Sequence, residues 1–489
     1  MEEEPLTILG ISAEDWARTP QTVRFALREL YKIVQAQTGE LNTLKLQLRD
    51  LQARLGQNSR NSSKPPSSDP PAAPPKPPKV ARGRKAGGQV GHEGHSRPLL
   101  PPEQVDEPIE LIPEQCPHCQ TVFPPELPCL GPPQRTQVAE LPVIRPHIIE
   151  YRQHTRCCPD CQRFVTADLP ADAPPGAFGP RATALMAVLR GCYRFSLDDA
   201  AEFLSDVCQL PLSAASIVSS CERTSEALAP VDVTIQAVVQ ASEQVNVDET
   251  SWRLADGKGW LWVAVCSIAT CFRIHTNRSK PALRHLLGEC FRGIVGSDRF
   301  FAYNQLPDGQ RQLCWAHLLR NLAGLADYYG DETRWPQRMR EWGGELFVLW
   351  HLYKGGWIDQ VGLQQHLIPI REAIRAELHA GSVSAQPKIV HFSKELLKHW
   401  DALWTFTRVE GVEPTNNAAE RALRHGVLWR KSCFGSRSEA GARFVERMLS
   451  VQATCKQQQR SVFAFVTEAV EAAWAGRPAP VLVTHPAVG

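Results

Sequence analysis

Apolar residues recur at alternating spacings of three and four along the N-terminal part of the chain. The series follows Thr19-Pro20, which is typical of a helix start with threonine as the cap and proline in the first turn. Only Gln37 interrupts it, and its members are Val23, Leu27, Leu30, Val34, Leu41, Leu44, Leu48, Leu51 and Leu55. Sustained over about five heptads, this repeat predicts a coiled coil that ends near Gly56 and pairs two copies of the chain. The alternative is one amphipathic helix lying on a globular domain, but the residues that follow offer no folded surface.

Those following residues, 58–80, are mainly Ser, Asn, Pro and Lys. Such a segment cannot bury enough surface to offset its ordering entropy, so we expect an extended spacer. A glycine-rich basic stretch comes next, with cations at Arg82, Arg84 and Lys85. It is typical of an arm laid along DNA phosphates, although an ordinary solvated linker would have the same composition.

Two C-P-x-C pairs follow, Cys116 with Cys119 and Cys158 with Cys161. Each pair forms a tight turn that points two thiolates at one tetrahedral ion, as in a zinc ribbon. The segment between the pairs, residues 120–157, is longer than usual and contains strand-like residues that could bring the second pair back. We predict a structural zinc held by these four thiolates, with Cys129, Cys157 and His154 as rival ligands.

Helical periodicity marks the residues from Gly179 to about Val239. Within them, SLDDAAEFLSDVCQLPLSAASIVSSCERT predicts a helix, a turn and a second helix capped by Ser213. This pattern is compatible with a helix-turn-helix that reads the DNA major groove, and equally with a plain helical hairpin. The small number of basic residues favours the hairpin.

After Gln244 the apolar period changes to that of strands. The runs QVNVDETSW, GWLWVAVCSI and TCFRIHT are followed by the helix-like SKPALRHLLGEC and a further strand-like run, GIVGSD. This order is that of a ribonuclease-H-like core, in which the first and fourth strands are adjacent and parallel. Asp248 and Asp298 stand at the ends of these two runs, so we expect their carboxylates to be neighbours.

A third carboxylate, Glu420, stands near the start of a predicted helix rich in cations. The cations that we expect to contact DNA phosphates here are Arg421, Arg424, Arg430 and Lys431. Three carboxylates can hold two Mg²⁺ or Mn²⁺ ions about 4 Å apart, an arrangement that serves phosphoryl transfer. Each acid also has an ordinary interpretation, as a turn aspartate, a loop aspartate or a capping-box glutamate, but the combination favours a metal site.

The segment between Asp298 and Glu420 is longer than a ribonuclease-H-like core requires. Most of its residues have helical patterns, which predicts a helical insertion over about 318–410. His317, in CWAHLLR, could assist near the carboxylates or be a structural histidine.

Length and composition limit the possible domain number, binding surface and location of this protein. A chain of 489 residues requires several domains, and 54 basic against 52 acidic residues confine any DNA-binding surface to local patches. The acidic start MEEEP lacks the apolar region of a signal peptide, and no apolar run is long enough to span a bilayer. The 15 cysteines, odd in number and scattered, suit a reducing compartment. We therefore expect a cytoplasmic protein, associated with the nucleoid when it is bound to DNA.

The ordered motifs together resemble the DDE transposases of the insertion sequence sixty-six family. The resemblance rests on NSSKPPSSD after the zipper, GGQVGHEGH, CPHC with CPDC, VNVDET, GWLWVAV, IVGSDRFFAYN, CWAHLLRNL and TNNAAERALRHGVLWRKSCFGSRSEAGARF. It implies that Asp248, Asp298 and Glu420 are the catalytic triad, and that small accessory proteins accompany the transposase. Ala86 and Val90 stand where the family pattern has prolines, which affects the arm and not the chemistry.

We therefore predict a multidomain α/β protein that cleaves transposon ends and transfers the strands to target DNA. Its expected parts are a coiled coil (1–57), a linker with the basic arm (58–104), a zinc module (105–170), a helical segment (171–240), a ribonuclease-H-like catalytic domain with the insertion (241–475) and a tail (476–489). Two alternatives are a DNA-binding regulator or domesticated transposase without catalysis, and a nuclease that only hydrolyses.

Overall fold

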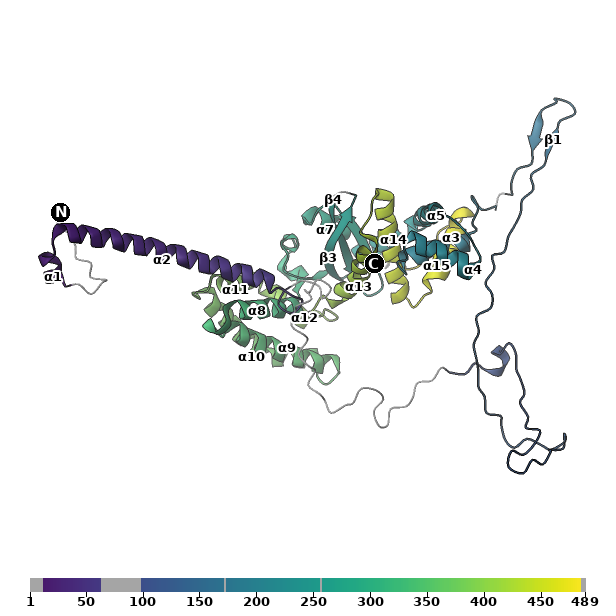
Figure 1. Ribbon diagram of the computed structural model, residues 1–489, viewed down its shortest axis with the longest axis horizontal. Coiled ribbons are helices and arrows are strands. Elements are labelled where there is room, and N and C mark those ends of the chain that lie inside the picture. The colour runs from purple at the N-terminus through teal and green to yellow at the C-terminus, as the bar shows by residue number, and fades with distance from the viewer. Residues whose placement is uncertain (1–11, 63–97, 171–172, 256, 485–489) are drawn as a thin grey trace. The chain divides into compact units, whose positions relative to one another are not determined.

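The computed structural model describes residues 12–62, 98–170, 173–255 and 257–484 (Figure 1). The chain divides into two compact units, each considered by itself. The larger comprises Met1–Ala73, Ile148–Asp206 and Pro211–Gly489, and the smaller comprises Pro74–His147 and Val207–Leu210. Most of the predicted linker and all of the predicted basic arm fall in 63–97, outside the described residues. None of the helices that the structure describes is long and apolar enough to cross a membrane.

The predicted N-terminal helix is present as α2 (Gln21–Leu55), after the short α1 (Ala13–Arg18). It begins one residue later than predicted, because Pro20 is the cap instead of the first helical residue, and Gly56 ends it as expected. No residue of α2 is buried in the single chain. The apolar series is thus exposed except for the half-buried Leu27, and its pairing with a second copy stays a prediction.

A five-stranded mixed sheet forms the centre of the larger unit. Its strands are β3 (Gln244–Leu254), β4 (Gly257–Val265), β5 (Thr270–His275), β6 (Ile294–Ser297) and β7 (Arg311–Leu313), in the order β5-β4-β3-β6-β7. The first three form an antiparallel meander, and β6 lies parallel to β3 and to β7. The helix α7 (Lys280–Leu287) connects β5 to β6. The predicted strands, the helix and the parallel pairing are confirmed, whereas β7 was not predicted.

Two helices that follow the insertion pack on this sheet. The helix α13 (Asn417–Cys433) lies against β3 and β4, and α14 (Glu439–Gln457) lies against the edge strand β5 (Figure 1). Alternate backbone N–H groups of β5 donate to side chains spaced four apart on α14: Thr270 to Thr454 Oγ1 at 3.1 Å, Phe272 to Ser450 Oγ at 2.9 Å and Ile274 to Glu446 Oε1 at 2.6 Å. A helix thereby closes this edge of the sheet.

The predicted helical segment contains α3 (Pro180–Gly191), α4 (Leu197–Cys208), α5 (Ala214–Ala227) and α6 (Ala229–Gln240). Ser213 caps α5 as predicted, because its Oγ accepts from the Ser216 N–H at 3.3 Å. The helix α5 packs against α3, α14 and the C-terminal α15 (Val462–Trp474). The predicted helix, turn and second helix are therefore confirmed, and the choice between a hairpin and a DNA-reading helix-turn-helix stays a prediction.

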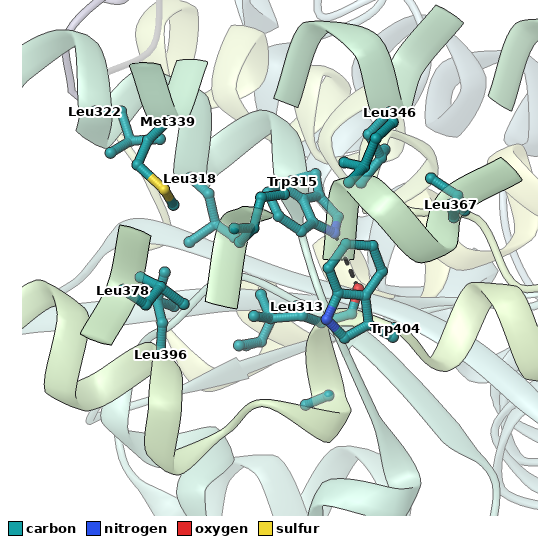
Figure 2. Close-up of a cluster of buried hydrophobic side chains, with 14 of the residues drawn as sticks. Leu313, Trp315, Leu318, Leu322, Met339, Leu346, Leu367, Leu378, Leu396 and Trp404 are labelled. Carbon is teal, nitrogen blue, oxygen red and sulfur yellow. Dashed lines mark hydrogen bonds between the residues drawn. The ribbon is translucent and has the colours of Figure 1, made fainter. Parts of the chain in front are cut away.

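The predicted insertion consists of helices with an apolar core of their own. They are α8 (Trp315–Tyr329), α9 (Trp335–Lys354), α10 (Gln360–Ser382), α11 (Pro387–Lys398) and α12 (Thr405–Arg408). Figure 2 shows leucines from several of these helices around Trp315 and Trp404. Trp315 Nε1 donates to the carbonyl of Leu403 at 2.9 Å, which ties the start of α8 to the end of the insertion.

The far end of α8 meets the end of α2. Tyr328 OH donates to Asp50 Oδ1 at 2.9 Å, and Lys388 Nζ lies 3.0 Å from the same oxygen. Just after α2, Asn61 Nδ2 donates to Asp327 Oδ2 at 2.8 Å. The helix α8 thus contacts the predicted zipper at one end, while its other end borders the sheet.

Candidate active site

Asp248 and Asp298 belong to adjacent parallel strands. The last paired residues of β3 and β6 are Asn246 and Gly296, and each aspartate lies two positions further along. A Cβ at residue 296 would stand 2.6 Å from Asn246 Oδ1, so the glycine leaves room for the Asn246 side chain beside β6. Both aspartates therefore follow the last β3–β6 pair at corresponding positions. The expectation that Asp248 ends its strand is wrong, because β3 continues to Leu254 through its pairing with β4.

The pKa of Asp248 lies well above its ordinary value. Burial is the largest cause, followed by the negative charges of Glu249 and Asp298, with Glu420 contributing as well. The Glu249 N–H donates to Asp248 Oδ1 at 2.9 Å, which offsets part of this effect. A carboxylate whose ionisation is disfavoured in this way is stabilised by a proton or a bound cation.

Glu420 occupies the first turn of α13 and faces the first turns of α8. Its Oε1 lies 2.7 Å from Arg320 Nη2 and 3.4 Å from His317 Nε2. Burial, followed by the positive charge of Arg320, lowers the pKa of His317. The negative charges of Glu420 and Asp298 act on the same imidazole in the opposite direction. His317 therefore stands among the predicted carboxylates, which the sequence left undecided.

Three side chains, only one of them from the predicted carboxylate triad, bring their possible metal-ligand atoms closest together. Those of Cys314, His317 and Glu420 all lie within 4.8 Å of one another, which the three predicted carboxylates do not achieve among the described residues. Cys314 accepts from the Asn416 N–H at 3.4 Å, and burial raises the pKa of its thiol to about 11. A buried, protonated thiol is a poor ligand for a hard ion, so this trio fits Mg²⁺ less well than carboxylates do.

Glu249 is a carboxylate that sequence reasoning passed over. It is buried on the opposite face of β3 from Asp248, where it accepts from Arg278 Nε at 2.6 Å and from Tyr303 OH. Burial, with the nearby Asp298, raises its pKa to about 7. Since its oxygens already have donors within the protein, Glu249 supports the site instead of offering it a ligand.

The predicted DNA contacts on α13 divide into two groups. Arg421, Arg424 and Lys431 are exposed on one side of the helix. Arg430 turns inward, where Nη1 donates to Thr250 Oγ1 at 3.2 Å and to the Ser251 carbonyl at 2.5 Å. These hydrogen bonds attach α13 to β3. The other predicted contacts, Arg82, Arg84 and Lys85, lie outside the described residues.

Each cysteine pair forms the same backbone turn within its own unit. Gln120 N–H donates to the Cys116 carbonyl and Gln162 N–H to the Cys158 carbonyl, both at 2.9 Å, and both glutamines are left-handed at φ 58° and 57°. The turn at Cys158 joins the short strands β1 (Thr155–Cys157) and β2 (Phe164–Thr166). The two half-sites thus share one geometry, and their joint binding of zinc stays a prediction.

One thiol in each turn has a pKa below its ordinary value. Hydrogen bonds, first with the Thr121 side chain, lower the pKa of Cys119 to about 7. Backbone N–H groups, first that of Cys161, lower the pKa of Cys158. Thiolates are the forms that bind zinc, so both turns suit a metal ligand.

Comparison with known proteins gives three matches. Residues 175–444 match the model of the Transposase IS66 family, which covers more than half of the chain. Residues 17–98 match a family of unknown function, DUF6444. An uncharacterized protein of Sinorhizobium fredii, y4hP, is 24% identical over 346 residues, which is 63% of this chain and 62% of that protein. The chain thus spans less than two thirds of the length of this curated relative.

Proposed function

We propose that this chain, which belongs to the Transposase IS66 family, cuts DNA at transposon ends and joins the freed strands to target DNA. The observation that carries the proposal is that Asp248, within β3, and Asp298, just after β6, occupy corresponding positions on adjacent parallel strands. Burial, followed by the negative charges of Glu249, Asp298 and Glu420, raises the pKa of Asp248.

The sheet supports a ribonuclease-H-like assignment of the core. Three antiparallel strands, a connecting helix and a strand parallel to the first are the arrangement expected of that fold. We infer that the insertion is an addition to this core, because it has its own apolar interior and lies in the chain between the second aspartate and the glutamate.

Asp248, Asp298 and Glu420 would hold Mg²⁺ or Mn²⁺. The oxygen donors suit hard cations. The neighbouring negative charges that disfavour the ionisation of Asp248 would be offset by a bound cation. The residues therefore fit the ions that this family implies. When bound, such ions activate an attacking oxygen and stabilise a leaving one.

Side chains of this protein would position the DNA and the glutamate for the reaction. Arg421 and Arg424 would neutralise backbone phosphates beside Glu420, and His317 with Arg320 would hold the glutamate in place. Water attacks the phosphorus at the transposon end, the P–O bond breaks, and the strand's 3′ oxygen leaves as a hydroxyl. That hydroxyl then attacks a target phosphate, one P–O bond forms, and the target's own 3′ oxygen leaves.

The remaining parts would assemble the DNA complex. Pairing through α2 would bring two transposon ends together, the basic arm with Arg82, Arg84 and Lys85 would follow phosphates, and a structural zinc would hold the cysteine turns. Small accessory proteins of the element are further proposed partners.

The test is a strand-cleavage and strand-transfer assay on the element's own terminal repeats, with Mg²⁺ or Mn²⁺. We compare the wild type with Glu420→Gln, using Glu439→Gln as a matched control because Glu439 is an exposed glutamate in the first turn of the next helix. Metal-dependent joining that Glu420→Gln lowers by roughly a hundredfold or more, while Glu439→Gln keeps it, is the expected result.

Other outcomes point elsewhere. Shortened strands without joined products would indicate a nuclease that only hydrolyses. End binding without cleavage under either metal would indicate a regulator. Full activity of Glu420→Gln would remove that residue from the site.

A further inference from the structure

A bulky aromatic side chain stands exposed where α13 ends. Phe434 follows the helix in the left-handed conformation, with φ 58°, and 74% of its surface is accessible. Glycine usually occupies this position, because a side chain with a Cβ is strained there. Because the apolar ring is mostly exposed, it also contributes little hydrophobic stabilisation to the fold. Two unfavourable features at one residue point to a role outside folding.

The turn around Phe434 is held firmly against the β3–β4 hairpin. Gly435, at φ 106°, has no room for a side chain, since a Cβ would stand 2.4 Å from the Arg253 carbonyl. The Ser436 N–H donates to that carbonyl at 2.9 Å, and Trp252 Nε1 donates to Ser436 Oγ at 3.2 Å. The exposed ring is therefore presented by a fixed backbone.

A cavity of about 590 Å³ opens beside the ring. Arg253 and Arg437 line it together with Cys433, Phe434 and Ser436, and its described lining contains no acidic residue. An exposed aromatic face next to two guanidinium groups has the chemistry of single-stranded nucleic-acid sites, where rings stack on bases and cations hold phosphates. The arginines matter here, because the C-terminal end of a helix is itself negative and repels phosphate.

The cavity lies within reach of a strand bound at the carboxylates. From Glu420 to Phe434, α13 rises roughly 21 Å at 1.5 Å per residue. The contact of Arg430 with Thr250 and Ser251 keeps this helix alongside β3, whose far end supplies Arg253. About six base pairs of DNA span such a length at 3.4 Å each. The same DNA end can contact both places.

We propose that this cavity binds an unpaired nucleobase near the transposon end, stacked on Phe434, with its phosphates at Arg253 and Arg437. The inference rests on the proposed function and deepens it, because it assigns a subsite for melted or extruded DNA. A base held outside the stack in this cavity would keep the DNA end open at that position.

The experiment measures binding of the full-length protein to two terminal-repeat DNAs, one blunt and one with a short unpaired extension containing 2-aminopurine. Phe434→Leu keeps an apolar side chain without a stacking face, and Phe434→Trp keeps the face. Trp357→Leu is the matched control, since Trp357 is an aromatic residue 81% exposed outside this cavity.

We expect Phe434→Leu to bind the extended DNA roughly tenfold more weakly, with blunt DNA bound as before, because stacking on one aromatic ring contributes about that much. Wild type and Phe434→Trp should quench 2-aminopurine, and Phe434→Leu should not. Melting temperatures of the variants should match the wild type, since the ring is exposed.

Several results would overturn the subsite. Equal binding of the extended DNA by wild type and Phe434→Leu would do so, as would an equal loss for Trp357→Leu. If Phe434→Leu leaves both DNAs unaffected but weakens capture of an accessory protein of the element, the cavity is a protein-docking site. A failure of the proposed function is separate, because then even the wild type neither cuts nor joins blunt ends.

Discussion

Arg320 Nη2 lies 2.7 Å from Glu420 Oε1, so a cationic side chain neutralises the carboxylate that we assign to metal binding. The guanidinium and a metal ion compete for the same oxygen. Arg320→Gln should therefore lower the Mn²⁺ concentration needed for half-maximal binding by roughly threefold to tenfold, given the partial exposure of the pair. Titration calorimetry on DNA-free protein measures this.

Arg320→Lys serves as the control, because it keeps the positive charge and should leave the metal requirement near that of the wild type. A higher metal requirement in Arg320→Gln would contradict this prediction, because it would show that losing the orientation of Glu420 outweighs losing the competing charge.

Glu446 gives a pH-dependent prediction. Burial raises its pKa above the ordinary value of 4.5, so the native state prefers the protonated acid. Its contribution to stability is then complete below about pH 4.5 and is lost as the pH rises through the raised pKa. Glu446→Gln removes this titration and still offers an oxygen to the Ile274 N–H. The free energy of unfolding should therefore fall less with rising pH in the variant.

Glu446→Ala tests the hydrogen bond itself. It leaves the Ile274 N–H at the sheet edge without its acceptor, which should cost about 1–3 kcal/mol at every pH. Denaturant titrations between pH 4.5 and 8 measure both variants. Parallel pH profiles for the wild type and Glu446→Gln would contradict the assigned direction.

The zipper is tested by a matched pair of leucines on α2. Leu44 belongs to the heptad series and Leu46 does not, although their exposures of 59% and 58% are nearly equal. Leu44→Lys should raise the dissociation constant of the dimer by at least tenfold, because it places a charge in the apolar seam, and Leu46→Lys should leave it unchanged. Analytical ultracentrifugation distinguishes them. A monomeric wild type would remove the coiled coil.

Zinc binding is tested through the polarised thiol of Cys119. We expect about one zinc per chain in protein purified without chelators, and less than half of that in Cys119→Ser. Cys290→Ser is the control, because Cys290 is an exposed cysteine outside both pairs. Elemental analysis measures the ratio, and the absence of zinc from the wild type would refute the site.

Local patterns predicted most of the fold. The alternation in residues 244–275 and the apolar stretch before Asp298 gave β3 to β6, and helical spacing gave α2 and the insertion. The strand β7 was missed because Arg311–Leu313 is three residues long, too short for any periodicity. Its position is set instead by pairing with β6, which is a long-range contact.

The site was predictable only in part. Asp248, Asp298 and Glu420 could be chosen because strand-like runs and a helix start mark them in the sequence. The partners Arg320 and Tyr303 could not, since each meets its carboxylate across a gap of more than fifty residues. The inward turn of Arg430 was equally hidden, because an arginine pattern does not reveal whether the side chain faces DNA or its own β3.

Both edges of the central sheet are covered by the chain's own segments. Side chains of α14 occupy the N–H groups of β5, while residues around α12 lie against β7, with Thr405 Oγ1 donating to the Arg311 carbonyl at 2.5 Å. No strand of another molecule can extend this sheet without displacing them. A partner that binds at the central sheet would therefore be recognised through side chains and helices, so mutations at surface side chains there should suffice to change the choice of partner.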